Sequence, residues 1–160
     1  MRIIEGTESA GGLKFAIVVS KYNDFVTDRL QKGALAALAE AGVRQDDVTV
    51  VRVPGAFEIP IAARHAADTR QFDGIVCLGC LIRGATPHFE FISSAVAHGL
   101  TAASGDTGIP MSFGVLTTNS VEEALERAVD GSSNKGWEAA MAAVEMAVVA
   151  AELSRDVSAT

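Results

Sequence analysis

The chain has 160 residues, 49% of them hydrophobic, and a formal net charge of −7. This length fits one domain spanning residues 1–160, and the sequence lacks the run of about 18 apolar residues that a membrane span needs. It also lacks the Lys/Arg cluster that gives a nucleic-acid binder its basic face, so we expect neither a membrane nor a nucleic acid as partner.

The first half of the chain predicts two strands and two helices. Lys14–Ser20 is a short run rich in Val and Ile, which is typical of a buried strand. Residues 27–41 place their apolar side chains on one stripe of a helix, which Gly42 can end. Val48–Val53 predicts a second strand, and Pro60, a residue favoured in the first helical turn, opens a second helix.

The second half continues this alternation. Asp73–Ile82 predicts a third strand and Ile109–Leu116 a fourth. Between them, Thr86 and Pro87 suit the N-cap and first position of a helix that runs towards residue 103.

The chain ends with two more predicted helices. Ser120 and Glu123 form a capping box for the fourth helix, a fifth spans residues 135–153, and Asp156 to Thr160 are expected to be frayed. Repeated strand–helix–strand units imply right-handed crossovers. The fold class is therefore α/β, a three-layer α/β/α sandwich around a four-stranded parallel sheet.

Ligands bind such sheets beyond the carboxyl ends of the strands, and unusual residues follow the predicted strands. The segments are Tyr22–Asn23, Pro54–Pro60, Arg83–Glu90 and Thr117–Asn119, and the fourth strand carries Phe113. We therefore expect these groups to meet at one edge of the sheet.

The segment Gly84–His88 combines small residues with a predicted helix N-terminus. Free N–H groups at such an end attract anions, phosphate especially. His88 can transfer protons near neutral pH. The alternative is that Thr86 is only a cap and His88 a surface histidine.

Other candidates also have two interpretations. Glu58 could accept hydrogen bonds from a polyol or only complement a helix dipole. Tyr22 and Phe113 could sandwich a flat heterocycle or be ordinary packing residues. Arg127 and Lys135 could be site cations, but most such cations are solvated surface charges, and spacing alone does not indicate a site.

Cys77 and Cys80 have C-x-x-C spacing but fall within one predicted strand. Positions i and i+3 of a strand face opposite sides of the sheet, and no second ligand pair is present. We therefore expect no metal site. Because cysteines are few and no signal peptide is evident, a cytoplasmic protein without disulfides is expected.

Taken together, several strings resemble the lumazine synthase family. They are VPGAFEIP (53–60), LGCLIRGATPHFEF (78–91), FGVLTTN (113–119) and NKGWEAA (134–140). Residues 20–23 resemble the family's first active-site loop, and the resemblance runs from about Ile3 to Leu153.

The resemblance implies a flavodoxin-like fold and a condensation that needs no cofactor. The 5-amino group of 5-amino-6-(ribitylamino)uracil would attack the ketone of 3,4-dihydroxy-2-butanone 4-phosphate. An imine would form, phosphate would be eliminated, and the ring would close with loss of water. The product would be 6,7-dimethyl-8-ribityllumazine, formed in the penultimate step of riboflavin biosynthesis.

The resemblance also assigns roles to residues around the pyrimidine substrate. Tyr22 would stack on the ring, where the family usually has Phe, Phe113 would close over it, and Asn23 belongs to the same first loop. Two segments would hold this substrate, largely through the main chain: Ala56, Phe57 and Glu58 for the ribityl chain, and Cys80, Leu81 and Ile82 for the uracil.

A second set is implied for the phosphate and the proton. Ala85 and Thr86 would bind phosphate, and His88 would transfer protons. Arg127 would pair with phosphate, held in orientation by Glu138, and Lys135 would add positive charge.

Family members form pentamers, and some close twelve pentamers into a 60-subunit icosahedral shell, with each site between neighbouring subunits. The spacing from Arg127 to Lys135 has no insertion that would obstruct a shell. However, Val129–Ser133 departs from the family's usual loop and places Asp130 where a cation is usual.

Three other functions compete with the transferase. A non-catalytic flavin- or lumazine-binding protein would be expected to lose His88 or Arg127, and both are present. A structural shell protein is compatible with catalysis. The archaeal type of riboflavin synthase shares the fold but would not need the His88 motif complete.

Overall fold

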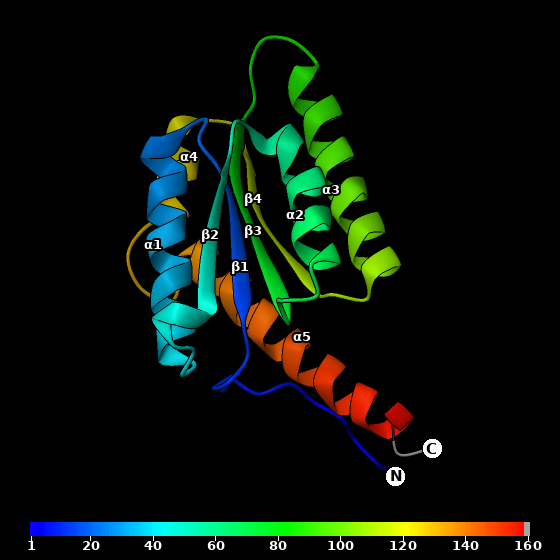
Figure 1. Ribbon diagram of the computed structural model, residues 1–160. Coiled ribbons are helices and arrows are strands. Elements are labelled where there is room, and N and C mark those ends of the chain that lie inside the picture. The colour runs from blue at the N-terminus through cyan, green and yellow to red at the C-terminus, as the bar shows by residue number, and fades with distance from the viewer. Residues whose placement is uncertain (159–160) are drawn as a thin grey trace.

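The computed structural model describes residues 1–158 and contains one parallel sheet of four strands in the order β2-β1-β3-β4 (Figure 1). The strands are β1 (Phe15–Ser20), β2 (Val48–Val53), β3 (Gly74–Ile82) and β4 (Met111–Thr118). All neighbouring strands pair in parallel, as the alternation of strands and helices predicted. Every carboxyl end therefore lies at the same edge of the sheet.

Helices cover both faces, which confirms the three-layer, flavodoxin-like α/β/α sandwich (Figure 1). One face carries α1 (Asp24–Glu40), α4 (Val121–Glu126) and α5 (Lys135–Ser158). The other carries α2 (Ile59–Asp68) and α3 (His88–Thr107). No helix in the described part of the chain is long and apolar enough to cross a membrane.

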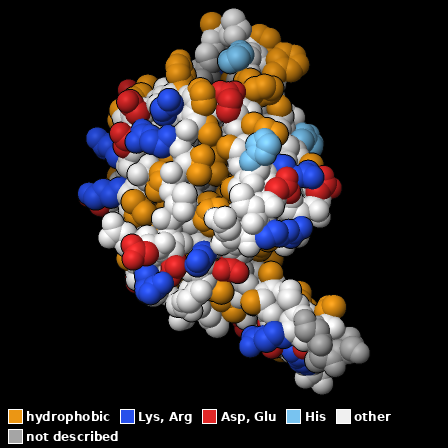
Figure 2. All heavy atoms as spheres, in the orientation of Figure 1, with side chains coloured by type: hydrophobic (Ala, Val, Ile, Leu, Met, Phe, Trp, Pro, Cys, Tyr) orange, Lys and Arg blue, Asp and Glu red, His pale blue; other side chains and the backbone are white. Residues whose placement is uncertain are grey.

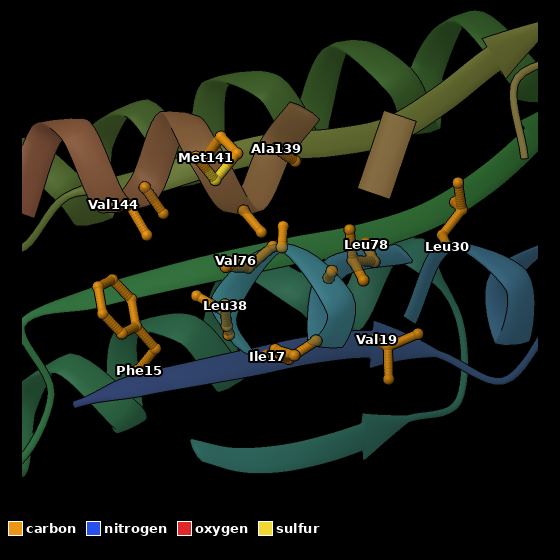
Figure 3. Close-up of a cluster of buried hydrophobic side chains, with 14 of the residues drawn as sticks. Phe15, Ile17, Val19, Leu30, Leu38, Val76, Leu78, Ala139, Met141 and Val144 are labelled. Carbon is orange, nitrogen blue, oxygen red and sulfur yellow. The ribbon is translucent and has the colours of Figure 1, made fainter. Parts of the chain in front are cut away.

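Two hydrophobic clusters hold the layers together, one on each face of the sheet. Because side chains alternate along a strand, Phe15, Ile17 and Val19 belong to the cluster under α1 and α5, which Figure 3 shows. Ala16 and Val18 belong to the cluster under α2 and α3. Strand β1 is buried on both faces, whereas β2, at the edge, is partly exposed.

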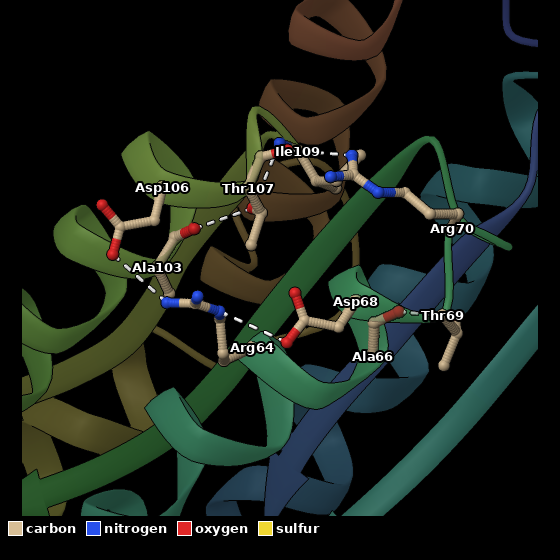
Figure 4. Close-up of polar contacts among 9 residues, drawn as sticks. All are labelled: Arg64, Ala66, Asp68, Thr69, Arg70, Ala103, Asp106, Thr107 and Ile109. Carbon is tan, nitrogen blue, oxygen red and sulfur yellow. Dashed lines mark hydrogen bonds and ion pairs between the residues drawn. The ribbon is translucent and has the colours of Figure 1, made fainter.

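A polar clasp joins α2 to α3 at the end of the molecule away from the carboxyl edge (Figure 4). The guanidinium of Arg64 contacts Asp106 at 3.2 Å and Asp68 at 3.4 Å. Arg70 donates to the carbonyl oxygen of Thr107 at 3.1 Å. These contacts join the two helices at the end opposite the carboxyl edge.

Some predicted boundaries were wrong. Helix α1 begins at Asp24, three residues before the predicted start, because Asn23 turns the chain through the left-handed region with φ 62°. Strand β4 is shifted by two residues, since Thr117 and Thr118 continue the ladder with Leu81 and Ile82.

Two helix ends also differ from the prediction. The residue that precedes α3 is Pro87, so Thr86 is not its N-cap, and His88 is the first helical residue. Helix α5 includes Asp156, which was expected to be frayed, and Arg2 pairs with this carboxylate at 2.8 Å. Residues 159–160 of the expected frayed tail lie outside the described residues.

Candidate active site

A cleft of about 510 Å³ opens at the carboxyl edge, where β1 and β3 end and α3 begins. Figure 2 shows apolar side chains exposed at this end of the molecule, beside the loop that rises between β3 and α3 in Figure 1. The lining combines aromatic and small residues with one histidine: Tyr22, Asn23, Gly55, Ala56, Phe57, Cys80, Leu81, Ile82, Gly84, Thr86, His88, Phe89 and Ile92.

The turn after β1 presents Tyr22 to this cleft. The N–H groups of Lys21 and Tyr22 donate to the carbonyls of Val53 and Pro54 at 2.8 and 3.1 Å. The side-chain amide of Asn23 donates to the carbonyl of Cys80 at 2.9 Å. These bonds tie the turn to β2 and β3, and they leave the Tyr22 side chain 72% exposed.

The turn after β2 is a short 3₁₀ helix, Ala56–Glu58, which separates its three side chains. Ala56 is buried under the cleft, whereas Phe57 is 61% exposed. Glu58 does not line the cleft directly. Its carboxylate turns back towards Gly55, where a Cβ would lie 3.4 Å from Oε1.

The loop after β3 carries the candidate anion site. Within the described residues, the backbone N–H groups of Ala85 and Thr86 have no hydrogen-bond partner. His88 follows as the exposed first residue of α3, and its side chain lines the cleft with Thr86. Free donors beside a helix N-terminus can hold an anion, with a proton-transfer group next to them.

The remaining predicted site residues lie in a second groove of about 580 Å³ between β4 and α5. Phe113, Arg127 and Lys135 line it, and Phe113 is 48% exposed. The two grooves share no lining residue. A single chain therefore brings together Tyr22 and His88 but does not bring Phe113 to them.

The cations of the second groove differ in their partners. Arg127 donates to the carbonyl of Glu123 at 2.9 Å. Glu138 was expected to orient Arg127, and this was wrong, because its carboxylate pairs with the ammonium of Lys135 at 2.8 Å. The backbone links the two cations, since Lys135 N–H donates to the carbonyl of Arg127 at 2.9 Å.

Asn134 supports this groove, a role that was not predicted from the sequence. Its fully buried side chain accepts from the N–H groups of Gly136 and Trp137 at 2.8 and 3.1 Å and donates to the carbonyl of Arg29 at 3.2 Å. A Cβ at Gly136 would lie 2.0 Å from the carbonyl oxygen of Leu30, so α5 approaches α1 only with glycine there. The string Asn134-Lys135-Gly136 could have indicated this role, because it places a helix-capping residue just before a glycine in the first helical turn.

The two cysteines are packing residues on opposite faces. Cys77 lies in the cluster under α2 and α3, and Cys80 in the cluster under α1 and α5. Burial raises the pKa of Cys77 to about 12 and that of Cys80 to about 11. No group of three His, Cys, Asp or Glu side chains suitable for a metal ion occurs among residues 1–158.

Comparisons with a family model and with individual proteins point to the same family. The sequence model of the family described as 6,7-dimethyl-8-ribityllumazine synthase matches residues 12–151. A 6,7-dimethyl-8-ribityllumazine synthase of Syntrophus aciditrophicus is 52% identical over 144 residues, which cover 90% of this chain and 94% of the relative. Another from Desulfatibacillum aliphaticivorans is 48% identical over 145 residues, covering 91% and 94%.

Proposed function

Because the chain belongs to the 6,7-dimethyl-8-ribityllumazine synthase family and is thus a transferase of riboflavin biosynthesis, we propose that it joins 5-amino-6-(D-ribitylamino)uracil to 3,4-dihydroxy-2-butanone 4-phosphate. The amine attacks the ketone and water leaves to form an imine. Phosphate is then eliminated, and attack of the ribitylamino nitrogen on the second carbonyl closes the ring with loss of another water. The steps involve no oxidant or reductant, so the reaction needs no redox cofactor.

The observation that carries the proposal is the position of His88 beside the free N–H groups of Ala85 and Thr86, facing an apolar cleft. A phosphate held at those N–H groups and the α3 N-terminus places the four-carbon substrate next to an imidazole. The condensation requires several proton transfers, and a histidine can both accept and donate a proton near neutral pH.

The rest of the first cleft suits the pyrimidine substrate. The exposed ring of Tyr22 offers a stacking surface, and Cys80, Leu81 and Ile82, which line the cleft, would contact the uracil through their main chain. Glu58 would reach ribityl hydroxyls at the margin of the cleft, together with main-chain groups of Ala56 and Phe57. Asn23 would act through its bond to Cys80, which positions the Tyr22 turn.

We assign the second groove to the same reaction through a neighbouring copy of the chain. Phe113, Arg127 and Lys135 line a groove that shares no residue with the first cleft. A homo-oligomer, as in a pentamer, can place one copy's second groove over another copy's first cleft. The dianionic phosphate then meets a guanidinium, which offers two parallel donors, and Phe113 covers the pyrimidine.

The wider proposal includes a single domain over residues 1–160, a cytoplasmic location and pentamers that can assemble into a 60-subunit shell. Residues 127–135, between the two cations, form a short connection. Light scattering of the purified protein distinguishes a pentamer from a shell, because the two differ twelvefold in mass.

A direct assay tests the function. The protein is mixed with both substrates, and lumazine fluorescence and release of inorganic phosphate are followed together. Equimolar product and phosphate, formed faster than in the spontaneous reaction, are expected. A non-catalytic lumazine- or flavin-binding protein would bind product without accelerating either signal, and that outcome would refute the proposal.

A further inference from the structure

The loop between β3 and α3 is secured by one side chain, Arg83. Its guanidinium donates through Nε to the Asn119 side-chain oxygen at 2.9 Å and pairs with the carboxylate of Glu90 in the first turn of α3. It also lies 4.6 Å from the ring centroid of Phe89, a residue that lines the first cleft. One arginine therefore joins the end of β3, the end of β4 and the start of α3.

The segment that Arg83 encloses has little other support. Residues 84–87 are exposed, and the backbone N–H groups of Ala85 and Thr86 are unpartnered within the described chain. At the base of the loop, the Arg83 N–H donates to the carbonyl of Thr118 at 2.8 Å. The position of the free N–H groups therefore depends on the residues that tie both ends of the loop.

The contacts extend on to α4. The N–H of Asn119 donates to the carboxylate of Glu123 at 2.8 Å, so the partner of Arg83 is itself held in place. A backbone hydrogen bond, and after it the hydrogen bond from Arg83, lower the pKa of the Glu90 carboxyl. The Glu90 carboxylate is therefore charged. Because it pairs with Arg83, this negative charge lies close to the place where a phosphate would bind.

We infer that Arg83, with Glu90 and Asn119, is a positioning clamp that presents the Ala85–Thr86 loop to the phosphate of the substrate. This inference rests on the proposed function. Arg83 does not need to touch the substrate, because a small displacement of a binding group is enough to weaken a transition-state or ground-state contact. As an exposed pair, the clamp contributes little to global stability but determines the geometry of one short loop.

The direction in which Glu90→Gln changes KM for the sugar phosphate distinguishes a positioning role of Glu90 from a purely electrostatic one. If Glu90 acted only through its charge, Glu90→Gln would remove a repulsion and lower KM for the sugar phosphate. If it is a partner in the clamp, Glu90→Gln raises that KM despite the loss of a negative charge. Arg83→Gln raises it as well, and the double variant is no worse than the more affected single variant, because both changes break one unit.

The experiment measures steady-state kinetics of the full-length oligomer with each substrate varied in turn, and the competitive inhibition constant of inorganic phosphate. We expect Arg83→Gln and Glu90→Gln each to raise KM for the sugar phosphate and the phosphate inhibition constant by about fivefold, the upper end for exposed charged pairs. The turnover number and KM for the pyrimidine should stay within about twofold. The control is Arg64→Gln, which removes an arginine of similar exposure that pairs with Asp68 and Asp106.

The result that overturns the inference is a lower KM in Glu90→Gln, additive effects in the double variant, or an equal rise in the Arg64→Gln control. An Arg83→Gln variant that melts earlier but keeps both KM values would show a structural role only and would also overturn it. Absence of lumazine formation by the unmodified protein would instead refute the proposed function, so the two failures are distinguishable.

Discussion

Activity restored by co-expressing two impaired variants would test the proposed division of the site between copies. The first variant carries Phe57→Ala and His88→Ala, which damage the cleft at the carboxyl edge. The second carries Phe113→Ala and Arg127→Ala, which damage the groove between β4 and α5. Because the two grooves share no lining residue, each variant keeps one intact half.

The expected activity follows from the geometry. In a closed ring with head-to-tail contacts, each site pairs the first cleft of one subunit with the second groove of the next. With equal co-expression and random assembly, an intact first cleft faces an intact second groove at about one site in four. The mixed oligomer should therefore recover about a quarter of the activity of the unmodified protein.

The assay is lumazine fluorescence with co-expressed and co-purified variants. Matched controls are each variant alone and the two variants mixed after separate purification, which should show only their residual activities. If the co-expressed sample does no better than these controls although mass spectrometry shows mixed oligomers, the two halves do not combine between copies and the reasoning fails.

Four further variants test individual residues or, for the cysteines, a pair. His88→Ala should lower turnover towards the low end of the ~10²–10⁴ range for proton transfer, with substrate affinity nearly intact; unchanged turnover would contradict its role. Arg127→Ala should raise KM for the sugar phosphate about tenfold, since a charged hydrogen bond contributes about 1.5–3 kcal/mol, but leave KM for the pyrimidine unchanged; an equal rise in both would indicate a structural role. The double change Cys77→Ala, Cys80→Ala should keep activity with a stability loss of a few kcal/mol at most, and the native thiols should resist alkylation at pH 8, because burial raises their pKa to about 12 and about 11; stoichiometric zinc would refute this. Asn134→Ala should lower the free energy of unfolding by about 2–4 kcal/mol at fixed protein concentration, since it removes a helix cap and three hydrogen bonds; a loss below about 1 kcal/mol in chemical denaturation would contradict the cap.

The layers of the fold were predictable because they depend on side-chain periodicity. The buried run of β1 and the amphipathic pattern of α1 are local properties that the fold preserves. Predicted element boundaries were wrong where pairing with a distant strand determines the boundary. Thr117 and Thr118 resemble a polar loop in the sequence, yet the register with β3 places both in β4, and no local pattern reveals the partner strand.

Helix starts failed for a different physical reason. Thr86 and Pro87 suit an N-cap and first position, yet α3 begins at His88. Arg83 pairs with Glu90 in the first turn of α3, a tertiary contact that local capping preferences do not take into account. The N–H groups of Ala85 and Thr86 have no partner within the described residues, so the failed boundary lies next to the candidate anion site.

The candidate site was predictable only in part. The rule that ligands bind beyond strand carboxyl ends correctly placed Tyr22, Ala56 and His88 at one cleft. The same rule did not separate Phe113 from them, because β4 is the outer strand, and Phe113 lines a groove at that edge of the sheet that shares no residue with the first cleft. Which strand lies at the edge depends on the topology of the whole sheet. No single segment of the sequence predicts the order β2-β1-β3-β4.

Lys135 and Arg127 have different hydrogen-bond and ion-pair partners, and these partners indicate which cation is more available to an anion. Lys135 already pairs with the carboxylate of Glu138 at 2.8 Å, so binding a phosphate requires it to exchange or share that partner. Within residues 1–158, Arg127 pairs with no carboxylate and donates one N–H to the carbonyl of Glu123. A guanidinium has five N–H donors in a fixed fork, so this bond anchors Arg127 while the others stay available. On a chain with a net charge of −7, we therefore expect Arg127, a guanidinium without a competing carboxylate, to contribute more to phosphate binding than Lys135, whose ammonium pairs with Glu138.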